Sequence, residues 1–189
     1  METVVFFLII TSFFCAINCR ISRSSEAQCL SYYNNEENFD LDTLSGQMYA
    51  VYYWPPNQRT RNACEVQTFK KLETHEIETA RNGCSNLSLP SEEPVIRATY
   101  KNSTGKIVNV LYYGSDSVKN FYRSCDKDVA KYIFTRVNED YILGINCSSE
   151  GRSVLLSKLL GSLSTVKRIV DGIDIMTGRE GSPDCVLEH

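Results

Sequence analysis

The chain has 189 residues, 42% of them hydrophobic, with 20 Lys and Arg against 23 Asp and Glu and a formal net charge of -3. This length suits a single domain with a buried core. The near balance of charge excludes a basic nucleic-acid-binding protein, and no acidic block indicates disorder.

The chain begins with an apolar run, residues 4–17, that is broken only by Thr11, Ser12 and Cys15. The run is shorter than the roughly 20 residues that a membrane-spanning helix needs. It predicts a secretory signal peptide over residues 1–19, a mature domain over 20–189 and an extracellular location. The alternative is a retained anchor, because no Lys or Arg precedes the run. No later segment of the sequence is apolar enough for stable membrane insertion.

After a polar segment, residues 32–42, the sequence breaks into short runs of Val, Ile, Tyr, Phe and Thr separated by Asn, Gly, Ser and Pro. This pattern predicts an antiparallel meander. Turn residues predict a tight hairpin at 101–106, and longer loops are expected at 83–93 and 115–128. The eight predicted strands are 46–55, 63–72, 74–81, 94–102, 106–114, 129–135, 140–148 and 152–160.

Near the C-terminus the hydrophobic period changes. Val166, Ile169, Val170 and Ile173 recur at helical spacing, which predicts an amphipathic helix at 163–176. Gly178 suits a helix end. Gly172 weakens a helix by about 1 kcal/mol relative to Ala, so this helix needs a surface to pack on. The chain is therefore predicted to be all-β, an eight-stranded antiparallel up-and-down barrel with a C-terminal α-helix packed outside, a fold that can hold one small ligand.

The number of cysteines favours cleavage of the signal peptide just after Cys19. An even number of cysteines in a secreted chain implies a disulfide framework, and cleavage just after Cys19 leaves an even number. The six cysteines of the predicted mature chain are Cys29, Cys64, Cys84, Cys125, Cys147 and Cys185.

No enzymatic motif is present. The two histidines, His75 and His189, have no metal-ligand spacing, so no metal site is predicted. A Cys nucleophile needs a free thiol and a nearby base, and all six mature cysteines are explained as bridges. The acidic group Glu73, Glu76 and Glu78 is expected on the surface. We therefore predict that the protein has no catalytic residues.

Two glycosylation sequons lie in predicted loops and predict glycans on Asn86 and Asn102. A third formal match, at Asn146, is discounted because it lies on a strand beside Cys147.

Three segments carry a family resemblance. Gly46-Gln47-Met48-Tyr49-Ala50-Val51-Tyr52-Tyr53-Trp54-Pro55 resembles the opening strand of lipocalins, in which Gly-x-Trp-Tyr is followed by an apolar residue and Pro. Asn138-Glu139-Asp140-Tyr141 resembles their Thr-Asp-Tyr segment, and Lys158 resembles the basic residue of their last strand. These segments occur in the order that lipocalins require. Residues 141–147 and Asn62-Ala63-Cys64-Glu65 resemble the cysteine-bearing segments of insect bilin-binding lipocalins, and the resemblance as a whole is to insect bilin-binding, apolipoprotein-D-like and salivary members. Met48 replaces the signature Trp, Lys158 the usual Arg and Glu139 the usual Thr, so ligand specificity is not transferred.

The resemblance implies a disulfide pairing. It pairs Cys29 with Cys147 and Cys64 with Cys185, which leaves Cys84 with Cys125. If Cys84 follows the third strand and Cys125 the fifth, both lie at the open end of the barrel. Such a bridge either limits how far the mouth opens or is a simple staple.

Alternation along the strands predicts the inner face of the barrel. An aromatic set of this kind suits a flat or conjugated apolar ligand; the alternative is that the side chains fill a closed barrel. A register error of one residue would turn a set outward. The predicted ligand-binding residues are Ala50, Tyr52, Trp54, Phe69, Tyr100, Val108, Val110, Tyr112, Tyr132, Phe134 and Leu143, with Ile96, Ala98 and Ala130 beside them.

The function that the resemblance implies is carriage of a small hydrophobic ligand by a secreted lipocalin. Its usual ligands are bilins, carotenoids, retinoids and lipids, and no cofactor is obligatory. The alternative is a salivary-type lipocalin that binds host proteins at the barrel rim or scavenges amines or eicosanoids. The carrier is favoured because the predicted inner face contains no carboxylate.

Overall fold

The computed structural model describes residues 25–33, 38–57, 64–84, 89, 93–102, 104–123 and 129–187. The predicted signal peptide lies outside these ranges. Among the helices in the described residues, none has the length and apolarity needed to cross a membrane.

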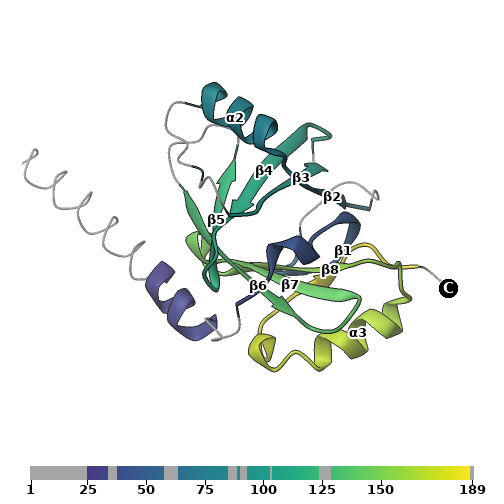
Figure 1. The fold of residues 1–189 in the computed structure, drawn as a ribbon. Helices are drawn as coiled ribbons and strands as arrows, with labels where there is room; N and C mark the ends of the chain where they lie inside the picture. Colours follow the sequence, from purple (N-terminus) through teal and green to yellow (C-terminus); the bar gives the residue numbers. More distant parts are fainter. Residues whose placement is uncertain are drawn as a thin grey trace, which may run out of the picture.

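Eight antiparallel strands form a closed barrel (Figure 1). Each strand pairs with the next, and β1 pairs with both β8 and β2, which closes the sheet. A short β9 (Ser182–Pro183) pairs with the last part of β1, beyond the residues that pair with β2. The predicted fold class is confirmed. The barrel strands are β1 (Gly46–Trp54), β2 (Val66–Lys71), β3 (Val95–Lys101), β4 (Ile107–Tyr113), β5 (Val118–Arg123), β6 (Ala130–Arg136), β7 (Tyr141–Asn146) and β8 (Arg152–Ser157).

The segment predicted as a third strand, 74–81, is a helix, α2 (Thr74–Gly83). The Glu76 carboxylate accepts a hydrogen bond from the Glu73 backbone N–H at 3.2 Å, which satisfies a donor that the first turn would leave open. Ile77 and Ala80, three residues apart, pack on the barrel wall. The strand prediction was wrong because alternation over a short window also fits this helical spacing.

The loop predicted at 115–128 contains β5. The polar residues Lys119 and Asn120 interrupt the apolar pattern that predicts a strand. Both are accommodated in β5 because other segments of the chain supply their hydrogen-bond partners. Lys119 Nζ donates to Asn38 Oδ1 at 2.9 Å, and Lys131 Nζ donates to Asn120 Oδ1 at 2.8 Å. The predicted number of strands is correct because one false strand offsets one missed strand.

The C-terminal helix, α3 (Leu163–Asp171), lies outside the barrel as predicted (Figure 1). It begins at Ser162, whose hydroxyl accepts a hydrogen bond from the Thr165 N–H, and it ends at Gly172 rather than at 176. A short 3-10 turn, η3 (Asp174–Met176), follows. The predicted helix is therefore five residues too long because the glycine inside it ends the α-helix.

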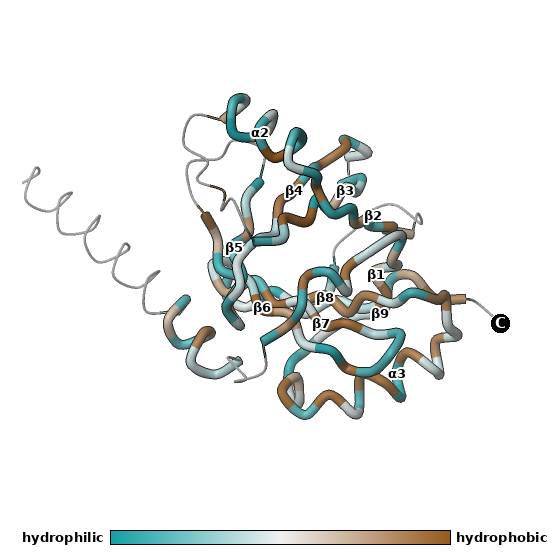
Figure 2. The backbone as a smooth tube through the Cα atoms, viewed as in Figure 1, coloured by the Kyte–Doolittle hydropathy of each residue, from teal (hydrophilic) through white to brown (hydrophobic). Residues whose placement is uncertain are grey.

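Apolar side chains form three clusters, and Figure 2 shows apolar segments both along the strands and on α3. The inner cluster lies inside the barrel and includes Ile96, Val110 and Leu156. The α3-side cluster lies between the outer wall and α3, around Val166 and Leu155. The α2-side cluster lies beneath α2.

Two disulfides tie the ends of the chain to the barrel. Cys29 bonds Cys147, with their Cα atoms 5.4 Å apart, and Cys64 bonds Cys185, with their Cα atoms 4.9 Å apart. These are the pairs that the resemblance implies. The first attaches the N-terminal helix at residues 25–33 to the end of β7, and the second attaches the C-terminal tail to the start of β2.

The position of Cys84 corrects the predicted rim clamp. Cys84 is disulfide-bonded, but it follows β2 and α2 rather than a third strand, and it packs in the α2-side cluster on the outer wall. Cys125, its predicted partner, lies outside the described residues. The reasoning that placed both cysteines at the mouth therefore fails at Cys84.

Candidate ligand-binding site inside the barrel

A β-bulge in β1 decides which of its aromatic residues face inward. Ala50 pairs with Leu156, but the next paired residue is Tyr52, opposite Leu155, so Val51 is the extra residue. A bulge inserts one residue and reverses the alternation beyond it. Ala50 and Tyr53 therefore pack in the inner cluster, whereas Tyr52 and Trp54 pack in the α3-side cluster. The prediction that Tyr52 and Trp54 face inward was wrong.

Leu143 also faces outward, contrary to the prediction. It lies in the α3-side cluster, whereas Ile142 belongs to the inner cluster. Residues 141–145 of β7 are all buried, because α3 covers the outer face and the barrel interior covers the other. A strand that is buried on both faces gives no alternation by which sequence reasoning can choose.

The other predicted residues face the interior. They include aromatic, branched and small side chains from β1 to β6, and Tyr100 is partly buried beside the rest. The buried members of the inner cluster are Ala50, Phe69, Ile96, Ala98, Val108, Val110, Tyr112, Tyr132 and Phe134. Ala130 shares this face by its pairing with Phe121.

An aromatic group occupies one part of the interior, centred on Tyr112. The Tyr112 ring centroid lies 5.3 Å from that of Phe121, 5.1 Å from Tyr132 and 5.0 Å from Phe134. Phe39, from the segment before β1, lies 5.3 Å from Phe134. The contacts of Tyr112 with Tyr132 and with Phe134 are edge-to-face, an arrangement that aromatic pairs prefer. These rings therefore pack together as one aromatic wall of the interior.

Gly144 on β7 makes room for the Tyr132 ring. A Cβ atom added at Gly144 would lie 2.7 Å from Tyr132 Oη and 2.9 Å from Tyr132 Cε1. The ring therefore lies directly against the backbone of β7, a close approach that a strand glycine permits.

Three tyrosine side chains interact in the interior. Burial raises the pKa of Tyr112 well above its ordinary value, and interactions with Tyr132 and Tyr100 add to the shift. Burial likewise raises the pKa of Tyr132. The Tyr112 and Tyr132 phenols are neutral hydrogen-bonding groups at physiological pH, so they offer polar contacts without charge.

Two buried polar residues were not predicted on the inner face: Gln67 in β2 and Glu65, which lies just before the strand. Gln67 pairs with inward-facing Met48, and Gln67 Nε2 donates to Glu65 Oε1 at 2.8 Å. Glu65 and Gln67 are 7% and 8% exposed. Counting back by twos from Phe69 would have found both. The inner face therefore contains a carboxylate, contrary to the prediction.

The segment before β1 covers the end of the barrel at which β1 begins. Phe39, Leu41 and Leu44 pack in the inner cluster around the 3-10 turn η1 (Leu41–Thr43). On β5, Lys119 is buried and its Nζ donates a hydrogen bond to Asn38 Oδ1. Burial lowers the Lys119 pKa, while nearby carboxylates oppose the shift. We call this end the floor; the strands that rise from it end at the opposite end, the mouth.

The residues that carry the family resemblance lie near the floor. Gly46 begins β1 with a φ of 74°, and Met48 is buried in the inner cluster. Lys158 is exposed and its Nζ donates to the Glu139 carbonyl at 2.8 Å. In the turn before β7, Asn138 Oδ1 accepts from the backbone N–H groups of Asp140 and Tyr141. Tyr141 itself packs in the α3-side cluster.

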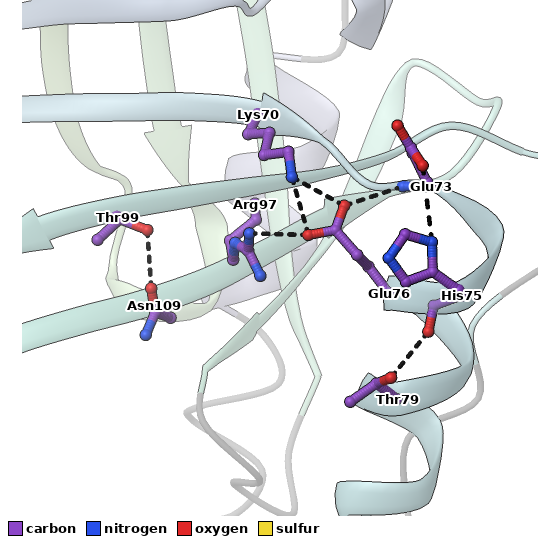
Figure 3. A network of polar contacts seen from close by, with 8 residues as sticks. All are labelled: Lys70, Glu73, His75, Glu76, Thr79, Arg97, Thr99 and Asn109. Carbon is purple, nitrogen blue, oxygen red and sulfur yellow. Dashed lines mark hydrogen bonds and ion pairs between the residues drawn. The ribbon is translucent and has the colours of Figure 1, made fainter.

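Polar residues around α2 form a separate network on the outer wall (Figure 3). Glu76 accepts from Lys70 at 2.9 Å and from Arg97 at 3.2 Å, and His75 Nδ1 lies 3.6 Å from Glu73. Lys70 most strongly lowers the Glu76 pKa, to about 2. The network lies on the surface, outside the barrel interior.

The two predicted glycosylation sites have different positions relative to the described residues. Asn102 lies in the β3–β4 turn, where its Oδ1 accepts from the Thr104 and Lys106 backbone N–H groups. Asn86 lies outside the described residues. Glycosylation of both remains a prediction.

The barrel strands surround an interior lined by apolar and aromatic side chains. The sequence matches no protein-family model and no curated protein sequence. Among solved structures the chain is similar to lobster apocrustacyanin A1, with 11% identity over 88% of this chain and 86% of that chain and a TM-score of 0.46. A superposition at this level is too loose to transfer a ligand or a function.

Proposed function

We propose that this protein is a secreted, non-enzymatic lipocalin that binds a small hydrophobic molecule inside its barrel and carries it in the extracellular medium. The observation that supports this proposal is the composition of the inner face. Apolar and aromatic side chains from all eight strands face one interior, and tyrosine phenols provide a few polar contacts. Pockets of this composition favour apolar ligands with few polar atoms.

The driving force is the removal of apolar ligand surface from water. At about 25 cal/mol per Å², burial of roughly 200 Å² contributes roughly 5 kcal/mol before the entropic cost of binding. The aromatic group around Tyr112 lowers that cost, because its rings are already packed against one another. Small inward residues, Ala50 and Ala98, add little volume of their own. A bilin, a carotenoid, a retinoid or a lipid fits these requirements.

Glu65 supports a second candidate function, the capture of an amine. A buried carboxylate on the inner face is able to pair with a ligand ammonium group. In the structure, however, the Glu65 carboxylate accepts a hydrogen bond from Gln67. That contact satisfies part of the carboxylate's hydrogen-bonding capacity, and the inner cluster is otherwise apolar and aromatic, so the apolar carrier is the first candidate.

A variant that fills the interior tests the proposal. Ala98 is fully buried on the inner face, between Phe69 and Val110 in the sheet. Ala98→Phe should abolish uptake of a fluorescent apolar probe, whereas the control Thr99→Phe, on the outward face of the same strand, should retain it. Far-UV circular dichroism checks that both variants fold; if Ala98→Phe does not, Val108→Phe, nearer the mouth, replaces it. Equal probe binding by folded inner and outer variants would overturn the proposal.

A further inference from the structure

Two arginines occupy inward-register positions at the mouth. Arg123 is the last residue of β5 and lies two positions after Phe121, which packs against the inner cluster. Arg152 is the first residue of β8 and lies two positions before Val154, a member of that cluster. Because side chains alternate along a strand, both arginines lie on the inner face. Both are exposed, as expected at the rim of the mouth.

The side-chain contacts of these two arginines differ from those of Arg97 and Arg179. Arg97 forms an ion pair with Glu76, and Arg179 donates to the Tyr33 hydroxyl and the Gly151 carbonyl. Among the described residues, no hydrogen bond or ion pair engages the side chain of Arg123 or of Arg152. Two guanidinium groups at the entrance of an apolar interior are therefore available to a ligand.

A third group lies beside Arg152 on the same face. Asn146, at the end of β7, pairs with Arg152 across the sheet. Its Oδ1 atom is buried without a hydrogen-bond partner. A buried polar atom without a partner costs stability, and a ligand can remove that cost. Rotation of the amide by half a turn presents its NH₂ donors instead.

We infer that the ligand is an apolar molecule bearing a carboxylate, held with its apolar body in the barrel and its carboxylate at the mouth between Arg123 and Arg152. This inference rests on the proposed function. Guanidinium groups bind carboxylates through charge-assisted, bidentate hydrogen bonds, and the Asn146 amide can supply another donor.

The test compares two probes that differ only in the carboxylate, cis-parinaric acid and its methyl ester. Fluorescence titration of the wild-type protein should give a dissociation constant about tenfold lower for the acid, because only the acid can form charge-assisted hydrogen bonds with the two arginines. Arg123→Gln/Arg152→Gln should remove most of this preference while leaving ester binding unchanged. Lys101→Gln/Lys106→Gln is the matched control, because it removes the same charge from exposed residues beside the mouth, with Lys101 on the outward register.

The outcomes separate the inference from the proposed function. If the wild type binds neither probe, the container itself is refuted. If it binds acid and ester equally, or if the lysine control loses the preference as fully as the arginine variant, the container stands and the carboxylate inference is overturned. Retained preference in the control and its loss in the arginine variant would establish the site.

Discussion

Gly144→Ala tests how tightly the aromatic group is packed inside the barrel. The added Cβ would lie 2.7, 2.9 and 3.2 Å from Oη, Cε1 and Cζ of Tyr132. The Tyr132 ring has little room to move, because its centroid lies 4.7 Å from Phe134 and 5.7 Å from Phe121. Overpacking of a core typically costs about 1–3 kcal/mol, so we expect a loss of stability in that range.

Urea unfolding followed by the fluorescence of Trp54 measures this loss, since Trp54 is the single tryptophan and is buried. At this chain length, each 1 kcal/mol corresponds to roughly 2–4 °C in Tm. Gly144→Ala/Tyr132→Leu should recover part of the penalty relative to the sum of the single variants, because it removes the clashing ring. The control is Gly83→Ala, where an added Cβ meets nothing within 4 Å. If Gly144→Ala is as stable as the wild type, the close contact between Tyr132 and β7 is wrong.

Three further predictions concern the bulge and two charged groups. Tyr53→Ala should weaken binding of an apolar probe, whereas Tyr52→Ala should leave it unchanged; the reverse result would contradict the bulge. The folded-state pKa of Glu76 is about 2, below its ordinary 4.5, so its contribution is present above pH 4.5 and lost as pH falls toward 2. The stability difference between wild type and Glu76→Gln should shrink over that window in acid titrations, and a constant difference would refute the ion-pair assignment. Burial lowers the Lys119 pKa below 10.5, so protonation costs stability in the folded state. Wild type should therefore gain stability relative to Lys119→Met as pH rises toward 10.5, measured by urea unfolding at each pH; a relative loss would contradict the burial effect.

Hydrophobic alternation predicted the inner face wherever one face of a strand is clearly more apolar. Val108, Val110 and Tyr112 on β4 alternate with Asn109 and Leu111, and the structure places the first three inside. If the same rule is extended back by twos from Phe69, it also places Gln67 and Glu65 on the inner face.

The errors have local physical causes. A bulge at Val51 changes no residue type, so nothing in the spacing of Tyr52, Tyr53 and Trp54 reveals it. Both faces of β7 are buried, which hides the orientation of Leu143. The helix α2 is stabilised by the Glu76 carboxylate, which caps the Glu73 backbone N–H, and by contacts with the barrel wall. The alternation of apolar and polar residues shows neither interaction.

Native mass spectrometry of protein secreted from insect cells, combined with an absorption spectrum, tests the central claim most directly. We expect a retained adduct of a small apolar molecule, coloured or not, that is released when the protein unfolds. The adduct should be absent from Ala98→Phe and present in Thr99→Phe. An empty wild-type protein that also takes up no fluorescent apolar probe would contradict the account of the barrel as a container.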